Sequence, residues 1–191
     1  MNSNFKRDGF LFLPQFIEKE SALALAEDYM SHTTNWTGDA YVPKSRSCND
    51  FAPFFELLCQ KTLHVMHLVE EPVLPTYAYG RVYEKGAELL KHTDREACEI
   101  SLTLHLNGDR KWPFIAGEHG FDLNPGDALM YLGETLPHGR EEYEGEYYAQ
   151  AFLHYIRSRG KYTHHFFDFP NRFSIELDRW LASKGLKREE I

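Results

Sequence analysis

The sequence predicts an α+β fold with a β-rich core, and three observations predict this class. Apolar residues recur at near-helical spacing in the first third of the chain, short runs separated by Gly, Pro, Asn and Asp follow, and an amphipathic stretch comes last. At 191 residues the chain can bury one sizeable core. We therefore expect one domain over residues 1–191, with a helical part at 1–72, a β core at 73–157 and a C-terminal extension at 158–191.

The helical part opens with a short predicted strand, because "GFLFLPQF" alternates loosely between apolar and polar residues. Residues 17–32 follow with apolar side chains at near-helical spacing and predict a first helix. A second helix is predicted over residues 50–71. Asp50 is its candidate N-cap, Pro53 falls in its first turn and Pro72 lies beyond its end.

The β core is predicted from short runs with turn residues between them, which are typical of a β-sandwich or small barrel. These runs are "VLPTYAYGRVYEKG", "CEISLTLHLNGD", "WPFIAGEHGFDLNPGD", "ALMYLGE" and "YYAQAFLHYI". In "SLTLHLN" the three leucines share one face of the strand, and we expect His105 to be packed or hydrogen-bonded on the other. After the core, "SIELDRWLASKG" predicts a short helix capped by Ser174 and closed by Gly185.

Charge and cysteine content exclude some functions. A formal net charge of −8 argues against a dedicated nucleic-acid binder, which needs clustered Lys and Arg. Cys48, Cys59 and Cys98 are an odd number without a CxxC pair, which favours reduced thiols over a disulfide framework. The start lacks the apolar core of a signal peptide, and no apolar run reaches membrane-spanning length. We therefore expect a cytoplasmic protein without a membrane partner.

A metal site is suggested by His92 and Asp94, which stand two residues apart in "LLKHTDREACEISLTLHLN". Residues i and i+2 of a strand point the same way, so an imidazole and a carboxylate can meet at one point. Two imidazoles and one carboxylate on one face of an octahedron are the ligand set of non-haem Fe(II) oxygenases. His138 follows a Pro-Gly-Asp turn and a short apolar strand, which places it at the mouth of a strand. Taken alone, the first pair also fits a solvated turn.

Several elements in a fixed order carry a resemblance to a known family. Tyr83-x-x-Gly86 comes first, then His92-x-Asp94, "LHLNG", "PGDALMY" and His138. This order resembles the double-stranded β-helix domain, a cupin-like jelly roll, of 2-oxoglutarate/Fe(II)-dependent dioxygenases. The prolyl 4-hydroxylase-like group is the most similar, and the start "FKRDGFLFLPQFIEKESALALAEDY" is similar to that of phytanoyl-CoA hydroxylase relatives.

The resemblance covers residues 5–157 and implies a fold, a set of cofactors and an activity. It implies N-terminal helices packed on one sheet and Fe(II) held by His92, Asp94 and His138. Its implied co-substrates are 2-oxoglutarate and O2, with ascorbate as an additional reductant. The implied reaction hydroxylates a C–H bond of an amino acid, a peptidyl side chain or a small metabolite, with release of succinate and CO2. The intact Asp94 places the chain with the hydroxylating branch, because halogenating relatives have a small residue there.

The co-substrate pocket departs from the family pattern. The distal carboxylate of 2-oxoglutarate needs a buried cation, because an unpaired buried carboxylate is costly. The family places a Lys or Arg about ten residues after the second histidine, where this chain has Tyr147 and Tyr148. We expect Arg140 to serve instead, with help from Tyr83 and from Tyr147. Arg81 is the second choice or a substrate contact, and a surface salt bridge is the alternative for both arginines.

Other polar residues are candidates for lesser roles. Arg95 follows Asp94 and is expected at the pocket rim, where it binds an acidic substrate group or remains a surface arginine. Trp112 falls near the family's pocket lining, with core packing as the alternative. Cys98 is expected on a strand in the core. We expect no metal at His164 and His165, since adjacent strand residues point apart, nor at His64 and His67 on their helix, which lack a nearby carboxylate or thiol.

Two other functions remain open from the sequence. The missing basic residue on the last strand favours a non-catalytic metal- or ligand-binding protein that keeps the fold. A cupin-type metalloenzyme that uses Mn, Ni or Zn usually gathers more histidines close together. The substrate is undetermined, and proline enters as a candidate by analogy with prolyl 4-hydroxylases.

Overall fold

Two antiparallel β-sheets form the centre of the molecule. A computed structural model describes residues 3–33, 41–168 and 172–187. The six-stranded sheet has the order β1 (Phe10–Leu13), β8 (Ala128–Tyr131), β5 (Ile100–Gly108), β10 (Tyr147–Arg157), β3 (Val73–Glu84) and β2 (Ser45–Cys48). The four-stranded sheet has the order β4 (Leu89–His92), β9 (His138–Arg140), β6 (Phe114–Ala116) and β7 (His119–Phe121). Helical elements are α1 (Ser3–Asp8), α2 (Lys19–His32), α3 (Ala52–Val69), the 3₁₀ turns η1 (Glu96–Cys98) and η2 (Thr163–His165), and α4 (Arg172–Ser183).

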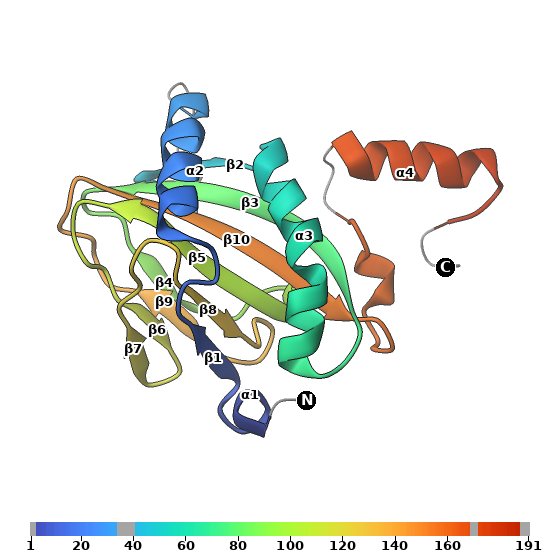
Figure 1. The fold of residues 1–191 in the computed structure, drawn as a ribbon, viewed down its shortest axis with the longest axis horizontal. Coiled ribbons are helices and arrows are strands. Elements are labelled where there is room, and N and C mark those ends of the chain that lie inside the picture. Colours follow the sequence, from blue (N-terminus) through green and yellow to red (C-terminus); the bar gives the residue numbers. More distant parts are fainter. Residues whose placement is uncertain (1–2, 34–40, 169–171, 188–191) are drawn as a thin grey trace.

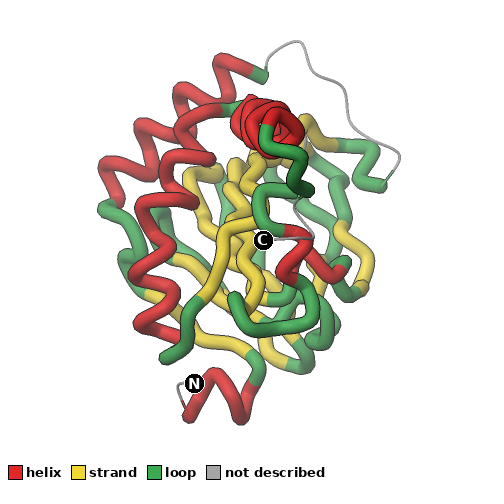
Figure 2. Tube along the Cα trace, turned by 90° about the vertical axis from the view of Figure 1, so that its right-hand side faces the viewer, coloured by secondary structure: helices red, strands yellow, loops and turns green. Residues whose placement is uncertain are grey.

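The six-stranded sheet is buried on both faces. Helices α2 and α3 cover one face (Figures 1 and 2), where the three leucines of "SLTLHLN" join the helices in one apolar cluster. Strand β8 shows the alternation: Ala128 and Met130 belong to this helix-side cluster, whereas Leu129 and Tyr131 pack with Phe114 of the other sheet. The expectation that the N-terminal helices pack on one sheet is confirmed.

The face between the two sheets carries polar and aromatic side chains. Gln150 pairs with His105 across β10 and β5, and His154 pairs with Ser101. His105 is 4% exposed and its ring stacks on Tyr148 with a centroid distance of 4.2 Å. His105 is therefore a packed core histidine, as expected. This inner face holds the site described below.

Several local predictions need correction. Helix α3 begins at Ala52 with Phe51 as its N-cap, so Asp50 is not the cap, although Pro53 does stand in the first turn. Helix α4 begins at Arg172, so Ser174 lies inside the helix and cannot cap it. The chain does turn at Gly185 with a positive φ of 70°, as a closing glycine requires.

The boundary between the helical part and the β core is also less sharp than predicted. Strands β1 and β2 lie before residue 73 and extend the six-stranded sheet at its two edges. Strand β2 was not foreseen, because "SRSC" shows no apolar alternation. Cys98 lies in η1 rather than on a strand, yet it is buried as expected. Among the described residues, no helix combines the length and apolar character that crossing a membrane requires.

Candidate metal centre

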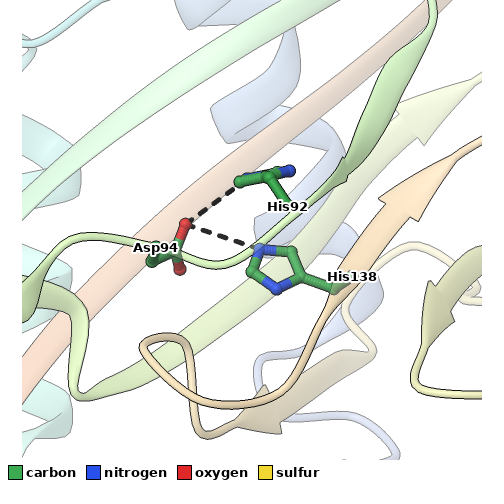
Figure 3. A group of neighbouring side chains, drawn as sticks. All are labelled: His92, Asp94 and His138. Carbon is green, nitrogen blue, oxygen red and sulfur yellow. Dashed lines mark ion pairs between the residues drawn. The ribbon is translucent and has the colours of Figure 1, made fainter.

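His92, Asp94 and His138 meet at the ends of two paired strands (Figure 3). His92 ends β4 and His138 begins β9, and the two residues are register partners across these antiparallel strands. Asp94 lies two residues beyond β4. Its Oδ1 atom is 3.5 Å from His92 Nε2 and 3.4 Å from His138 Nε2. Antiparallel pairing thus joins two histidines that are far apart in sequence.

The backbone orients both imidazole rings. His92 Nδ1 is 2.8 Å from the carbonyl oxygen of Leu90, and His138 Nδ1 is 2.9 Å from that of Leu136. A carbonyl can only accept, so in each neutral ring Nδ1 carries the proton and donates it. Nε2 is then the nitrogen that faces Asp94. It donates to the carboxylate when the ring is protonated, and when the ring is neutral it presents the lone pair that a metal-binding histidine needs.

Asp94 is held from its backbone and from its second oxygen. Its N–H donates to the carbonyl oxygen of Gly133 at 2.8 Å, and its Oδ2 accepts from Ser101 Oγ at 3.1 Å. Burial opposes ionisation of this carboxyl, but hydrogen bonds from His138 and His92 prevail and lower the pKa of Asp94 below its usual value. The hydrogen bond to Asp94 in turn raises the pKa of His92. Asp94 is therefore a carboxylate at neutral pH.

This donor set fits a six-coordinate Fe(II) ion. Neighbouring ligands bound at about 2.1 Å lie about 3 Å apart, so the donor separations of 3.4 and 3.5 Å need to close by only a few tenths of an ångström. Two imidazoles and one carboxylate on one face leave three positions open. His92, Asp94 and His138 border a cavity of about 360 Å³ in which those open positions can be used.

The cavity wall is largely aromatic and includes some of the predicted site residues. Arg81, Tyr83 and Arg95 line it, whereas Arg140, Tyr147 and Trp112 do not. Its aromatic and imidazole side chains are those of Tyr41, Tyr77, Tyr79, Tyr83, Phe114, Tyr131, Phe152 and His154. Sequence reasoning missed Tyr77, Tyr79 and His154. The two-residue period of side chains along β3 and β10 could have found them, because it places them on the same inner face as Tyr83.

Arg140 lies behind this wall, deep between the sheets. It is 3% exposed, donates to the carbonyl oxygen of Trp112, and its Nη2 is 3.2 Å from Gln150 Oε1. The rings of Trp112, Phe114 and Tyr148 surround its guanidinium at 4.6, 5.3 and 4.8 Å. No carboxylate of the described residues forms an ion pair with it, and its Nε has no hydrogen-bond partner among them. Gln150 Nε2 and Tyr148 OH are likewise buried and unpartnered within the described structure.

The remaining predicted co-substrate residues have different surroundings. Arg81 is 8% exposed and its Nη1 donates to Ser45 Oγ at 2.7 Å. Tyr83 is buried, with its ring 4.9 Å from that of Trp112. Tyr147 packs against the helix-side apolar cluster, on the opposite face of β10 from Tyr148. The structure therefore does not bring Tyr147 to the metal-site cavity, because a one-residue difference on a strand selects the opposite face.

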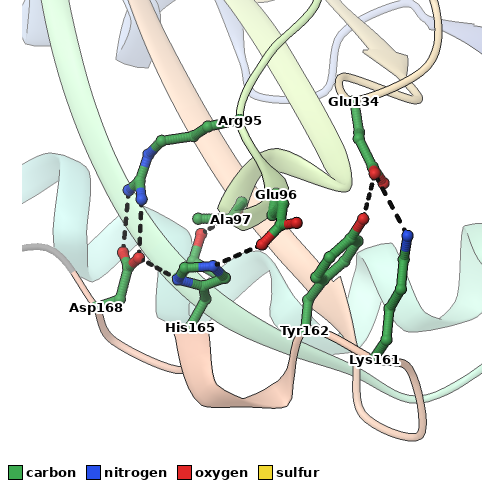
Figure 4. Close-up of polar contacts among 9 residues, drawn as sticks. Arg95, Glu96, Ala97, Glu134, Lys161, Tyr162, His165 and Asp168 are labelled. Atoms are coloured by element: carbon green, nitrogen blue, oxygen red, sulfur yellow. Dashed lines mark hydrogen bonds and ion pairs between the residues drawn. The ribbon is translucent and has the colours of Figure 1, made fainter.

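Arg95 belongs to a polar network with the C-terminal extension (Figure 4). Its guanidinium bonds both oxygens of Asp168, at 2.9 and 3.1 Å, and stands 4.7 Å over the Tyr77 ring. Asp168 also bonds His165 Nδ1 at 2.6 Å, and His165 Nε2 is 3.7 Å from Glu96. The rim position of Arg95 agrees with the sequence, but its charge is paired.

The two adjacent histidines of the extension are closer together than predicted. His164 and His165 lie on the 3₁₀ turn η2 rather than on a strand, and their rings are 4.2 Å apart. With Glu96 they form a further group whose donor atoms could hold a metal, though its members are largely exposed. The same extension contacts the loop that precedes His138, since Tyr162 and Lys161 bond Glu134 (Figure 4).

Trp112 fills the core rather than the metal-site cavity. It is 5% exposed, its Nε1 donates to the carbonyl oxygen of Glu141 at 2.8 Å, and its ring packs between Tyr83 and Tyr143. Its edge borders a separate cavity of about 490 Å³ on the protein surface. Core packing, the alternative given by the sequence, describes its position.

Comparisons with known proteins identify the fold. No family model matches the sequence, and no curated protein is similar to it. Solved structures are similar, however. HygX from Streptomyces hygroscopicus, with nickel and 2-oxoglutarate bound, is 16% identical with a TM-score of 0.64, over 83% of this chain and 86% of HygX. A Pseudomonas putida prolyl-4-hydroxylase is 16% identical with a TM-score of 0.63, over 82% and 96%.

A third structure extends the range of chemistry found on this fold. SnoN, a non-haem α-ketoglutarate-dependent epimerase from nogalamycin biosynthesis, is 13% identical with a TM-score of 0.66, over 82% of this chain and 80% of SnoN. The chain therefore has the fold of the Fe/2-oxoglutarate-dependent oxygenases. Since hydroxylases and an epimerase share this fold, the activity must be argued from the site.

Proposed function

We propose that the protein is an Fe(II)- and 2-oxoglutarate-dependent dioxygenase that hydroxylates a C–H bond and releases succinate and CO2. The convergence of His92, Asp94 and His138 at one cavity, with both Nε2 lone pairs directed by backbone carbonyls, carries this proposal. We also assign the two sheets to a double-stranded β-helix, the core expected from the resemblance. The substrate is an amino acid, a peptidyl side chain or a small metabolite.

The chain's own residues have three tasks in this reaction. His92, Asp94 and His138 hold the ion on one face and keep the other positions open for co-substrate and O2. The bound ion supplies O2 activation coupled to the decarboxylation of 2-oxoglutarate. The aromatic cavity wall limits the access of water to the reacting groups. Ascorbate enters only as an auxiliary reductant.

Arg140 is the proposed anchor for the distal carboxylate of 2-oxoglutarate. The buried guanidinium of Arg140 has no ion-paired carboxylate among the described residues. Such a charge destabilises the folded protein unless an anionic ligand pairs with it. Tyr83, at the cavity wall, is the proposed second donor. Arg81 lines the cavity itself and is the alternative anchor, although part of its donor capacity already goes to Ser45.

Arg95 is the proposed contact for an acidic substrate group. It lines the cavity and its side chain is 47% exposed, so a substrate carboxylate can compete with Asp168 for its two donors. Trp112 does not line this cavity, so we assign it no substrate contact. Its role is to pack against Tyr83, which does line the cavity.

The decisive experiment adds 2-oxoglutarate to the anaerobic Fe(II)-loaded protein. We expect a visible metal-to-ligand charge-transfer band, followed by succinate formation when O2 is admitted, with or without ascorbate. His92→Ala should lose both signals. His64→Ala, at an exposed position of α3, is the matched control and should keep them.

Two results would contradict the proposal. Normal succinate formation by His92→Ala would show that the triad is not the metal site. Absence of both band and succinate in the wild-type protein would favour the non-catalytic binding protein, which the lack of a basic residue at Tyr148 also suggests.

A further inference from the structure

His154 is a buried imidazole in the cavity wall that the proposed reaction does not yet use. It lies on β10 beside the metal centre and is 2% exposed. Its Nδ1 is 2.9 Å from Ser101 Oγ, and the same oxygen is 3.1 Å from Asp94 Oδ2. A chain of hydrogen bonds therefore connects His154 to the carboxylate of the triad through one hydroxyl group.

The neighbours of Ser101 determine which nitrogen of His154 carries the proton. Ser101 Oγ has one hydrogen to donate, and it faces two groups that can only accept: Asp94 Oδ2 and, at 3.2 Å, the carbonyl oxygen of Cys98. If His154 Nδ1 also accepted, two acceptors would remain unsatisfied in a buried site. Nδ1–H therefore donates to Ser101, and Nε2 carries the lone pair. Burial lowers the pKa of His154 to about 4, so the ring is neutral at physiological pH.

Nε2 of His154 is left without a partner. It is fully buried and no described residue hydrogen-bonds to it. An unsatisfied buried acceptor is unfavourable, and a ligand that donates a hydrogen bond to it would remove that cost. His154 also stands in a row of flat rings: its centroid is 4.5 Å from Tyr77 and 5.8 Å from Tyr79, and Tyr79 stacks on Phe152 at 4.6 Å.

The charges around the cavity indicate which kind of ligand group can donate a hydrogen bond to Nε2 of His154. The guanidinium group of Arg81 lines the same cavity and repels an ammonium group, whereas the charge of Arg95 is paired with Asp168. A neutral donor, such as a hydroxyl or an amide N–H, fits better than a charged one.

We propose that His154 is a substrate-binding residue whose Nε2 accepts a hydrogen bond from a neutral hydroxyl or amide N–H of the substrate. The apolar part of that substrate lies against the rings of Tyr77, Tyr79 and Phe152. This inference extends the proposed function and rests on it, because a substrate-binding role for His154 requires that the protein is an enzyme. It defines the substrate class as a molecule with a neutral donor and an apolar, preferably planar, portion.

The first test reads the tautomer directly. Long-range ¹H–¹⁵N correlation spectra of the full-length, metal-free protein labelled at histidine nitrogens should show His154 with a protonated Nδ1 and a bare Nε2. The spectrum of His154→Gln assigns the signal. Ser101→Ala should shift the population toward Nε2–H, because the acceptor for Nδ1–H is removed. A wild-type His154 protonated at Nε2 would overturn the proposal.

The second test compares two probes that differ by one donor. Binding of 4-fluorobenzyl alcohol and of 4-fluoroethylbenzene to the same metal-free protein is followed by ¹⁹F NMR. We expect the alcohol to bind about 3- to 10-fold more tightly, which corresponds to one net hydrogen bond. The charged analogue 4-fluorobenzylamine should bind more weakly than the alcohol.

Variants of His154 give the control. His154→Phe keeps the ring stack but has no acceptor, so the ratio of the two dissociation constants should fall to about 1. His154→Leu replaces it if the phenylalanine variant does not fold. His154→Gln should keep part of the preference, since its Oε1 atom can accept. An unchanged ratio in His154→Phe or His154→Leu refutes the proposal.

The two proposals fail separately. A charge-transfer band with no alcohol preference removes the role of His154 and leaves the oxygenase standing. An alcohol preference without band or succinate keeps His154 as a ligand contact and removes the oxygenase.

Discussion

Gly133 is the residue whose substitution most directly tests the geometry of the metal centre. It follows β8, and its carbonyl oxygen accepts from the backbone N–H of Asp94. A Cβ atom added there would lie 2.5 Å from Asp94 Oδ2, 2.3 Å from the carbonyl oxygen of Cys98 and 2.6 Å from Ser101 Oγ. One of these atoms is an oxygen of the carboxylate itself, and another belongs to Ser101, which donates a hydrogen bond to that oxygen. Gly133→Ala therefore perturbs the proposed ligand without removing any ligand atom.

The distances give the size of the effect. Ordinary contacts begin near 3.4 Å, so the loops around Gly133 must separate by about 1 Å. Overpacking of this kind costs about 1–3 kcal/mol of unfolding free energy, which lowers the melting temperature by about 2–12 °C in a domain of this size. Displacing the groups that orient a metal ligand typically costs 10- to 100-fold in metal affinity. We expect Gly133→Ala to lose both stability and Ni²⁺ affinity.

The assay combines thermal unfolding of the metal-free protein with calorimetric titration of Ni²⁺. Gly120→Ala is the matched control, because a Cβ there meets Pro113 Cβ at an ordinary 3.9 Å. It should leave Ni²⁺ affinity unchanged. Wild-type Ni²⁺ affinity in Gly133→Ala would refute the argument, since it would mean that Asp94 does not depend on the approach of this loop.

Three further outcomes are expected. Arg140→Met should weaken 2-oxoglutarate binding, followed by the charge-transfer band, by about 30-fold or more, and Arg81→Met by less than about 5-fold; the reverse order would make Arg81 the anchor. Saturating Ni²⁺ should raise the melting temperature of the wild-type protein, and an equal rise in Asp94→Ala would exclude the triad as the binding site. Burial and the charge of Arg140 lower the pKa of His105 to about 3, whereas the unfolded ring titrates near 6.5, so stability falls as the pH falls between these values. In urea unfolding, His105→Phe should reduce the slope of the unfolding free energy against pH by up to about 1.4 kcal/mol per pH unit. Parallel pH curves for the variant and the wild-type protein would contradict this prediction.

The sequence predicted the parts of the fold that depend on local pattern. The helices α2 and α3, the main strands of the β core and the position of His105 on the face opposite the leucines all follow from periodicity and turn residues. Helix boundaries were less certain, because a cap is selected by the local backbone. At α3 the helix starts after Phe51, and the side chain of Asp50 is not used.

The candidate site was predictable only where residue order encodes it. His92, Asp94 and His138 could be found because strand pairing brings such a pattern together, and the structure does so. The sequence did not show which residues of β10 face the cavity. It therefore included Tyr147, which lies on the other face, and missed His154, because a single position on a strand reverses the face. The pairing of Arg95 with Asp168 joins residues far apart in sequence, and no local pattern announces it.

The position of Arg140 offers a physical explanation for the basic residue that the last strand lacks. Its guanidinium reaches from β9 to β10, where it touches the ring of Tyr148 and the amide of Gln150. A cation that comes from a strand of the other sheet can therefore occupy the space next to the position where the family places one. The unpartnered Nε of Arg140, Nε2 of Gln150 and OH of Tyr148 are three donors at that place. If a carboxylate binds there, all three gain an acceptor, and the buried charge of Arg140 gains a counter-ion. Titration of the Arg140→Met variant with 2-oxoglutarate distinguishes this arrangement from one in which Arg140 only joins the two sheets.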